Sequence, residues 1–170
     1  MPTIFTHIVV PLAWRVAKRR QPPDIRSVVT AMGLAVLPDA DVIAFVAGVP
    51  YASAFGHRGF THSIAFAVVT ALVALAWLRP VRTKLFSVGT FLFVAAASHP
   101  LLDALTNGGL GVALLWPWSD ARWFAPWRPV AVSPIGAHFF GARGVTVLLS
   151  EMLWIWLPLA FTALVVRLRR

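Results

Sequence analysis

The sequence predicts an all-α integral membrane protein: a bundle of about four spanning helices, with a short N-terminal apolar helix and an irregular Trp-rich interfacial loop. Hydrophobic residues make up 59% of the chain and charged residues 12%, which is too apolar for an ordinary soluble domain. The positive charges lie in short clusters that border apolar runs. A length of 170 residues corresponds to about one domain, so residues 1–170 are expected to form a single membrane-embedded unit.

The formal net charge of +9 is compatible with nucleic-acid binding, but its distribution favours an explanation by membrane topology. The basic residues gather at Arg15–Arg20, Arg79–Lys84 and Arg167–Arg170, which is typical of cytoplasmic loops and termini. Nucleic acid is therefore not an expected partner, whereas membrane lipid is. Because the chain has no cysteine, any metal ion would be held by His, Asp, Glu or water.

The first apolar segment, Thr3–Trp14, is too short to span a membrane alone. It lacks a basic start and a clear small-residue cleavage site, so we do not expect a removable signal peptide. The first expected span, Ser27–Val49, contains Pro38, Asp39 and Asp41 near its middle. An aspartate at the centre of a membrane helix costs roughly 2.5–3.5 kcal/mol, and a proline removes a backbone donor. We therefore expect a helix that is broken at Pro38 and carboxylates that have partners.

Three further spans are expected in the rest of the chain. A helix over His62–Leu78 has Thr61 as its expected cap. The segment Leu85–Thr106 would be about 33 Å long if fully helical, which is enough to span. The last span is expected over Val145–Val166. Between these two spans, Leu110–Gly144 is rich in proline and tryptophan and is expected to be an irregular interfacial loop, because Trp concentrates at the headgroup level.

Placing all the basic clusters in the cytoplasm brings four separated stretches to the outer half of the bundle. These stretches carry His7, Asp39 and Asp41, His57 and His62, and His99 and Asp103. Hydropathy alone does not require metal-ligand residue types to gather at one level. The sequence therefore predicts a metal centre towards the outer face of the membrane.

The spacing of the candidate ligands leaves alternatives open. His99 and Asp103 are spaced i and i+4, so on a helix they share a face and could hold an ion, or could simply hydrogen-bond to each other. Asp39 and Asp41 would diverge on a regular helix. They converge only if the break at Pro38 places them in a turn, and otherwise they would cap the next helix.

The segment from His57 to His62 contains two histidines and Arg58, with Gly56 and Gly59 allowing a tight turn that aims both rings inward. Arg58 could clamp an anionic substrate oxygen or lie among the lipid headgroups. Two other ionisable residues have more than one interpretation: His7 is a candidate ligand or an interfacial histidine, and Glu151 is a candidate ligand, base or partner of Arg143. His138 is expected at the interface with the tryptophans.

Several of these segments resemble the YdjM-like family of membrane-bound metal-dependent hydrolases. The resemblance covers nearly the whole chain and is carried by Thr6-His7, Leu37-Pro38-Asp39-Ala40-Asp41, His57-Arg58-Gly59-Phe60-Thr61-His62-Ser63, Ser98-His99-Pro100-Leu101-Leu102-Asp103, and Arg143-Gly144 with Glu151. That family is in turn distantly similar to zinc-dependent phospholipase C and single-strand nucleases, whose H-x-x-x-D pair on a helix binds a multinuclear zinc site. His99 and Asp103 match that pair. Those soluble enzymes also have a closely spaced His and Glu pair, whereas His138 and Glu151 are far apart here, so the number of ions stays open.

The resemblance implies a hydrolase of a prokaryotic inner membrane that acts on a phosphoester or lipid-like substrate through a metal-activated water, with zinc as the first candidate ion. The expected core ligands are Asp39, His62, His99 and Asp103, followed by His7, His57 and Asp41. Arg58 is expected to orient the substrate, and Glu151 to act as a ligand or base. The competing functions are a transporter of divalent ions or protons and a structural membrane protein whose polar residues satisfy one another.

Overall fold

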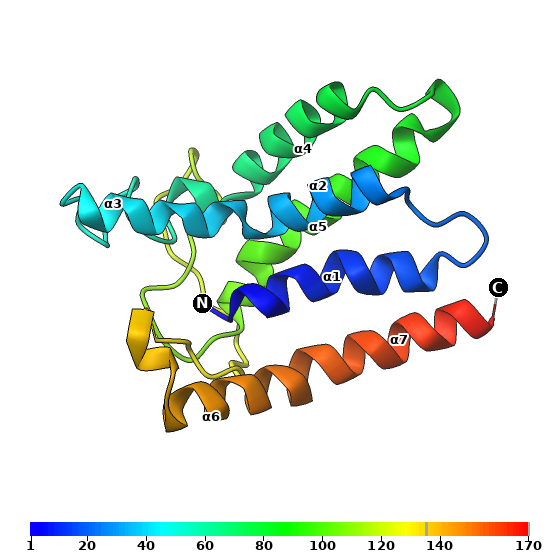
Figure 1. Ribbon diagram of the computed structural model, residues 1–170. Helices are drawn as coiled ribbons and strands as arrows, with labels where there is room; N and C mark the ends of the chain where they lie inside the picture. The colour runs from blue at the N-terminus through cyan, green and yellow to red at the C-terminus, as the bar shows by residue number, and fades with distance from the viewer. Residues whose placement is uncertain (135, 170) are drawn as a thin grey trace.

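The protein is all-helical in a computed structural model that describes residues 1–134 and 136–169, and these residues contain no β-strand (Figure 1). The helices are α1 (Ile4–Ala17), α2 (Ile25–Val36), α3 (Ile43–Val46), α4 (Ile64–Leu78), α5 (Leu85–Ala104), α6 (Ala142–Glu151) and α7 (Leu157–Leu168). This confirms the all-α part of the predicted fold class. Ile135 in the Trp-rich loop and Arg170 in the last basic cluster lie outside the described residues.

Two helical stretches are long and apolar enough to cross a membrane, Arg82–Ala104 and Ala142–Leu168. The second runs continuously from α6 through a π-helical turn, Met152–Trp156, into α7. The expectation of about four spanning helices is not supported. The helices at the other two expected spans are shorter, with 12 residues in α2 and 15 residues in α4.

Pro38 ends α2 as predicted, and the chain continues as the 3-10 helix η1 (Leu37–Val42) into α3. Proline has no N–H with which to continue the α-helical hydrogen bonds. Leu37 nevertheless keeps helical dihedral angles, so α2, η1 and α3 follow one another without a sharp bend (Figure 1). The break places Asp39 and Asp41 in a tighter helix, where residues two apart are less divergent than they would be on an α-helix.

Helix α4 begins two residues later than the sequence suggested, because Ser63 and not Thr61 caps it. The hydroxyl of Ser63 accepts a hydrogen bond from the backbone N–H of Phe66 at 3.0 Å. The hydroxyl of Thr61 donates instead to a carboxylate oxygen of Asp41 at 2.7 Å. The prediction that Thr61 caps α4 is therefore wrong, because the Thr61 hydroxyl contributes to the candidate site instead.

Helix α5 lies at the centre of the bundle and packs against α1, α2 and α4, while α7 packs along α1. The contact between α4 and α5 is built on small residues, with Ala67, Ala71 and Ala74 buried on α4. Small side chains allow two helix backbones to approach closely, and van der Waals contact then holds them together. The outer faces stay apolar and exposed, as at Val73 (65%) and Phe161 (70%), which is typical of a lipid-facing surface.

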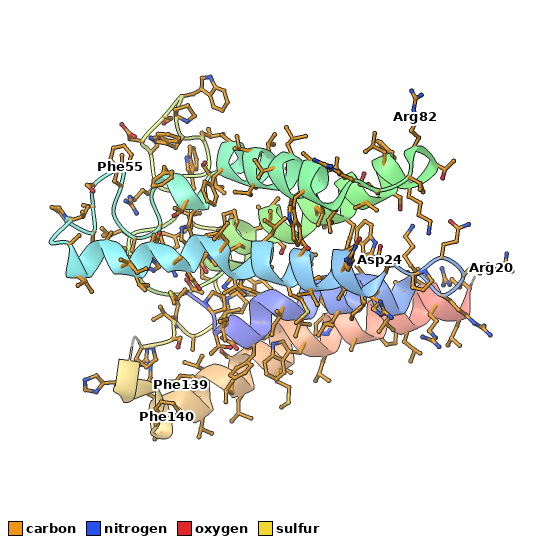
Figure 2. The ribbon with its side chains drawn as sticks, turned by 45° about the horizontal axis from the view of Figure 1, so that its top comes forward. Arg20, Asp24, Phe55, Arg82, Phe139 and Phe140 are labelled. Carbon is orange, nitrogen blue, oxygen red and sulfur yellow. The ribbon has the colours of Figure 1, made fainter. Side chains whose placement is uncertain are left out.

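The three basic clusters lie at one end of the bundle. The loop after α1, the connection between α4 and α5, and the C-terminal end of α7 all lie at this end (Figure 1). Arg20, Asp24 and Arg82 mark it in Figure 2. The segments that carry the candidate site residues lie towards the opposite end, together with the Trp-rich region, which is irregular as predicted and includes the exposed Trp118.

The cap of α2 provides a test of local stability. The carboxylate of Asp24 accepts hydrogen bonds from the backbone N–H (3.0 Å) and the hydroxyl (2.8 Å) of Ser27. We expect Asp24→Ala to lower the free energy of unfolding by about 1 kcal/mol, and Asp24→Asn to keep most of it. Thermal unfolding followed by circular dichroism in detergent would measure both, and equal losses would argue against the cap.

The same cap predicts a dependence on pH. The hydrogen bond from the Ser27 N–H lowers the pKa of Asp24 below its usual value. A carboxyl group with a lowered folded-state pKa contributes stability that is present at neutral pH and is lost as the pH falls through that pKa. The difference in unfolding midpoint between wild type and Asp24→Ala should therefore shrink in acid, and a constant difference would contradict this.

Candidate metal centre

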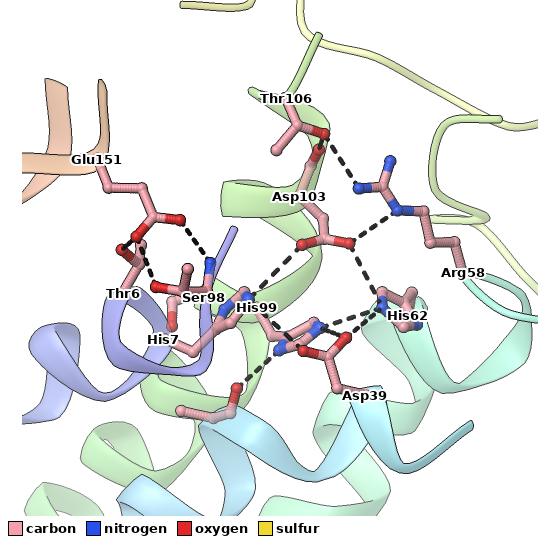
Figure 3. Close-up of polar contacts among 12 residues, drawn as sticks. Thr6, His7, Asp39, Arg58, His62, Ser98, His99, Asp103, Thr106 and Glu151 are labelled. Carbon is pink, nitrogen blue, oxygen red and sulfur yellow. Dashed lines mark hydrogen bonds and ion pairs between the residues drawn. The ribbon is translucent and has the colours of Figure 1, made fainter. Parts of the chain in front are cut away.

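Four separate stretches of the chain bring their histidines and aspartates together at one buried place (Figure 3). His7 comes from α1, Asp39 from η1, His62 from the 3-10 turn Phe60–His62, and His99 and Asp103 from α5. The side chains of the three histidines and Asp103 are 0% exposed, and that of Asp39 is 11% exposed. The structure thus assembles the expected core ligands and His7 in one cluster.

The donor atoms of this cluster have the spacing of a metal-binding site. Nε2 of His62 lies 3.0 Å from Nε2 of His99, 3.5 Å from Oδ2 of Asp103 and 3.8 Å from Oδ1 of Asp39. Nε2 of His99 lies 3.4 Å from the same Asp39 oxygen. Ligands about 2.0–2.2 Å from a tetrahedral zinc ion are about 3.3 Å apart. Asp39, His62, His99 and Asp103 therefore fit a four-ligand site.

The hydrogen bonds on the far sides of the two imidazoles fix which nitrogens carry protons. Nδ1 of His99 lies 2.7 Å from the backbone carbonyl of Ala35, which can only accept, so this nitrogen is the donor. Nδ1 of His62 faces Asp41 at 3.2 Å. When both rings are neutral, neither Nε2 atom carries a proton. Their lone pairs, 3.0 Å apart, then repel each other unless a cation or a proton lies between them.

Buried polar atoms without a hydrogen bond also concentrate here. In the described part of the chain, these atoms include both ring nitrogens of His7, Oδ1 of Asp39 and both carboxylate oxygens of Asp103, of which Oδ2 is ion-paired with Arg58. Buried polar atoms are normally satisfied, and each exception costs free energy. A metal ion bound among these oxygens and nitrogens would remove that cost, so the residues fit the ion that the sequence predicts.

Asp41 and His57 form a second group that meets the first at His62. Asp41 accepts from Nδ1 of His57 at 2.6 Å, from the N–H of Arg58 at 3.1 Å and from Thr61 at 2.7 Å. Asp39 and Asp41 thus both face His62, Asp39 at Nε2 and Asp41 at Nδ1 of its ring. Because Asp41 is already satisfied by these donors, it is suited to orient His62.

The charges around the 3-10 turn shift two pKa values. Burial alone would raise the pKa of Asp41, but its contacts with His57 and His62 outweigh burial and hold that pKa below its usual value. Burial would lower the pKa of His62, but Asp103, Asp39 and Asp41 raise it to about 10. The three carboxylates therefore favour the protonated, positively charged form of His62.

Arg58 is fully buried, and its guanidinium group faces inward. Its Nε lies 3.0 Å from Oδ2 of Asp103, and its other nitrogens donate to Gly108 and Thr106 at 2.9 and 3.0 Å. The guanidinium group thus holds Asp103 in place. Its expected role in orienting a substrate stays a prediction.

The sequence suggested that Gly56 and Gly59 allow the tight turn around Arg58, but the residue with the unusual backbone conformation is a different one. The left-handed residue is Arg58 itself, with φ of 63°. Gly56 and Gly59 are needed for close approach, because a Cβ atom would lie 2.2 Å from the Pro50 carbonyl oxygen and 2.1 Å from the Ala54 carbonyl oxygen. Holding a non-glycine residue in this conformation costs about 1 kcal/mol or more, which the contacts of Arg58 must offset.

Glu151 lies beside the cluster, and its carboxylate accepts hydrogen bonds from residues at the start of α1. It is buried, and it accepts hydrogen bonds from the backbone N–H and hydroxyl of Thr3 and from the hydroxyl of Thr6 at 2.8 Å. These bonds tie the end of α6 to the start of α1. His138, which was expected at the interface, is exposed.

Sequence reasoning missed Arg122, which fixes the loop around His57. It donates to the carbonyl of His57 at 3.0 Å and to the carbonyls of Tyr51 and Ser53 at 3.1 and 2.9 Å. The sequence could have indicated Arg122 only by its position, because it lies in the Trp-rich region, apart from the basic clusters. Thr106, which supports Arg58, gave no signal because a threonine at a helix end is ordinary.

Comparisons with known proteins identify the family of this chain. The sequence model of the family described as "YdjM inner membrane protein" matches residues 1–169. The chain is 45% identical to the inner membrane protein YbcI of Escherichia coli K12 over 160 residues, which covers 93% of this chain and 92% of YbcI. It is 41% identical to the inner membrane protein YdjM of the same organism over 76 residues, 44% of this chain and 35% of YdjM. No solved structure matches. The chain therefore belongs to the YdjM family of inner membrane proteins.

Proposed function

We propose that this membrane protein is a metal-dependent hydrolase that acts on a phosphoester or lipid-like substrate. The observation that carries the proposal is the pair of Nε2 atoms of His62 and His99, 3.0 Å apart and beside the carboxylates of Asp39 and Asp103. Nitrogen and oxygen donors without thiolates are the ligand set of hydrolytic zinc and of harder divalent ions.

The residues divide the work between binding and positioning. Asp39, His62, His99 and Asp103 would hold one ion, with His7 stacked on His99 at 3.8 Å between ring centroids as a neighbouring ligand or proton acceptor. Asp41 and the Ala35 carbonyl orient the two imidazoles, and Arg58 holds Asp103. A divalent ion in such a site polarises a phosphoester oxygen and lowers the pKa of a water molecule towards neutrality.

Access to the cluster supports an amphiphilic substrate. Asp39 is the partly exposed ligand, with 11% of its side chain accessible, whereas Asp103 and the histidines are 0% exposed. The cluster lies away from the basic end of the bundle, which the positive-inside rule assigns to the cytoplasm. We place the site towards the outer face, where a lipid headgroup could reach Asp39.

Transport is the weaker candidate, because a transported ion needs a polar path through the bundle. From His99 towards the basic end, the buried residues of α5 are apolar, including Ala95, Leu92, Phe91 and Val88. Helices α2 and α4 complete this region with Ala31, Leu34, Ala67 and Ala71. Among the described residues, this core cluster contains no ionisable side chain.

Metal content is the first test. We expect the purified protein to retain a divalent ion, measured by inductively coupled plasma mass spectrometry, and to lose thermal stability on treatment with chelator. His62→Ala and His99→Ala should each lose the ion. His138→Ala should retain it, because His138 is exposed and outside the cluster. A wild-type protein that holds no divalent ion and is indifferent to chelator would rule the proposal out.

Hydrolysis is the second test. Detergent-solubilised protein should release a phosphorylated headgroup or phosphate from a phospholipid or a lipid phosphate ester. Asp103→Asn should lower the rate by about 100-fold or more, because it weakens a ligand and leaves Arg58 unpaired. His138→Ala serves as the matched control.

The two candidate functions make opposite predictions in the same preparation. If wild-type protein hydrolyses none of the lipids but carries a divalent ion across proteoliposome membranes, and Asp103→Asn abolishes that flux, transport replaces hydrolysis. Retained metal with neither activity would also refute the hydrolase. Hydrolysis that survives both Asp103→Asn and His62→Ala would place the chemistry outside this cluster.

A further inference from the structure

The basic end of the bundle contains a hollow that the metal centre does not use. Two neighbouring cavities of about 500 and 510 Å³ share Lys18, Arg20, Gln21 and Ser87 in their walls. The first cavity also reaches Arg19 and Arg169, and the second reaches Lys84. Together they form one groove between the loop after α1, the start of α5 and the end of α7, which we call the basic groove.

The basic groove is strongly positive. Its cationic side chains come from three separate parts of the chain: Lys18, Arg19 and Arg20; Lys84; and Arg169. Asp24 is the one acidic residue among the described wall residues, and its carboxylate already accepts two hydrogen bonds from Ser27. Among the described residues, no ion pair joins these cationic groups to Asp24, and together they line a space large enough for a phosphate group.

The floor of the basic groove is apolar. Trp14, Val88 and Phe91 line it, and the rings of Trp14 and Phe91 lie 5.9 Å apart. Nζ of Lys18 lies 5.7 Å from the centre of the Trp14 ring, which holds a cation above the floor. Membrane topology alone explains positive charge at this end, but it does not require a walled groove with an aromatic floor.

One wall of the groove is fixed before any ligand arrives. Arg15 donates to the backbone carbonyl of Pro23 at 2.7 Å, which ties the loop after α1 back onto the helix. The two prolines in that loop, Pro22 and Pro23, restrict its backbone further. A site that is formed in advance loses less conformational entropy when a ligand binds.

We propose that the basic groove binds the phosphate group of an anionic membrane lipid such as phosphatidylglycerol. The cationic side chains would contact the phosphate, and the glycerol and upper acyl carbons would lie on Trp14, Val88 and Phe91. Basic pockets between membrane helices on the cytoplasmic side suit anionic lipid headgroups. This site lies at the opposite end of the bundle from Asp39 and does not depend on the hydrolase proposal.

The test uses the full-length protein in neutral detergent. Phosphatidylglycerol, phosphatidylcholine and inorganic phosphate are added separately, and lipid retention by native mass spectrometry and the thermal unfolding midpoint are recorded. We expect phosphatidylglycerol to be retained and to raise the midpoint, and phosphatidylcholine and phosphate to have little effect. An equal effect of inorganic phosphate would overturn the lipid assignment, and equal retention of phosphatidylcholine would overturn selection for an anionic headgroup.

A matched pair of variants separates the groove from general surface charge. The triple variant Lys18→Gln, Arg20→Gln, Lys84→Gln removes three charges from the groove walls. The control, Arg26→Gln, Arg79→Gln, Arg82→Gln, removes three charges from residues outside those walls. We expect the groove variant to bind phosphatidylglycerol about tenfold or more weakly and the control to bind it like wild type.

Metal content provides the check on folding. Both triple variants should retain the divalent ion at the wild-type level if wild type holds one, and both should keep the wild-type helical circular dichroism spectrum. Equal loss of phosphatidylglycerol binding in the two folded variants would refute the groove. If hydrolysis is not found but the groove variant alone loses phosphatidylglycerol, lipid binding in the basic groove is still supported.

Discussion

The buried carboxylate of Asp103 is the interaction on which the site depends. A carboxylate removed from water costs several kcal/mol unless opposite charges and hydrogen bonds compensate it. Arg58 supplies the nearest positive charge at 3.0 Å, so the guanidinium group must be buried as well. Its remaining bonds then require the Gly108 carbonyl and Thr106 at their observed positions. At Gly109, whose φ is +86°, a side chain would also lie 2.9 Å from the Arg58 guanidinium group.

The same constraint links the regular and irregular parts of the molecule. His99 and Asp103 are fixed by the central helix α5, while His62 and Arg58 arrive on a short turn between loops. That turn is held by Asp41 from one side and by Arg122 from the other. The helices therefore supply a rigid pair of ligands, and the loops are shaped to bring the others to it.

The sequence was sufficient for the all-helical class and for most of the residues that gather around His62. An apolar composition, the break at Pro38 and the i, i+4 pair on α5 each reflect a local rule that tertiary structure did not override. It was not sufficient for the number of spanning helices, because hydropathy does not reveal where the α-helix ends within an apolar segment such as Ser27–Val49. It also missed Arg122 and assigned the cap to Thr61, since the partners of these side chains lie far away in sequence.

The alanines between α4 and α5 have a consequence for the genetics of this protein. Ala67, Ala71 and Ala74 are not candidate ligands, yet they are buried on the helix that follows His62, which packs against the helix that carries His99. Enlarging any of them would push these helices apart and widen the gap between the two imidazoles. A mutational scan should therefore reveal a stripe of intolerant positions along the buried face of α4, in addition to the candidate ligands.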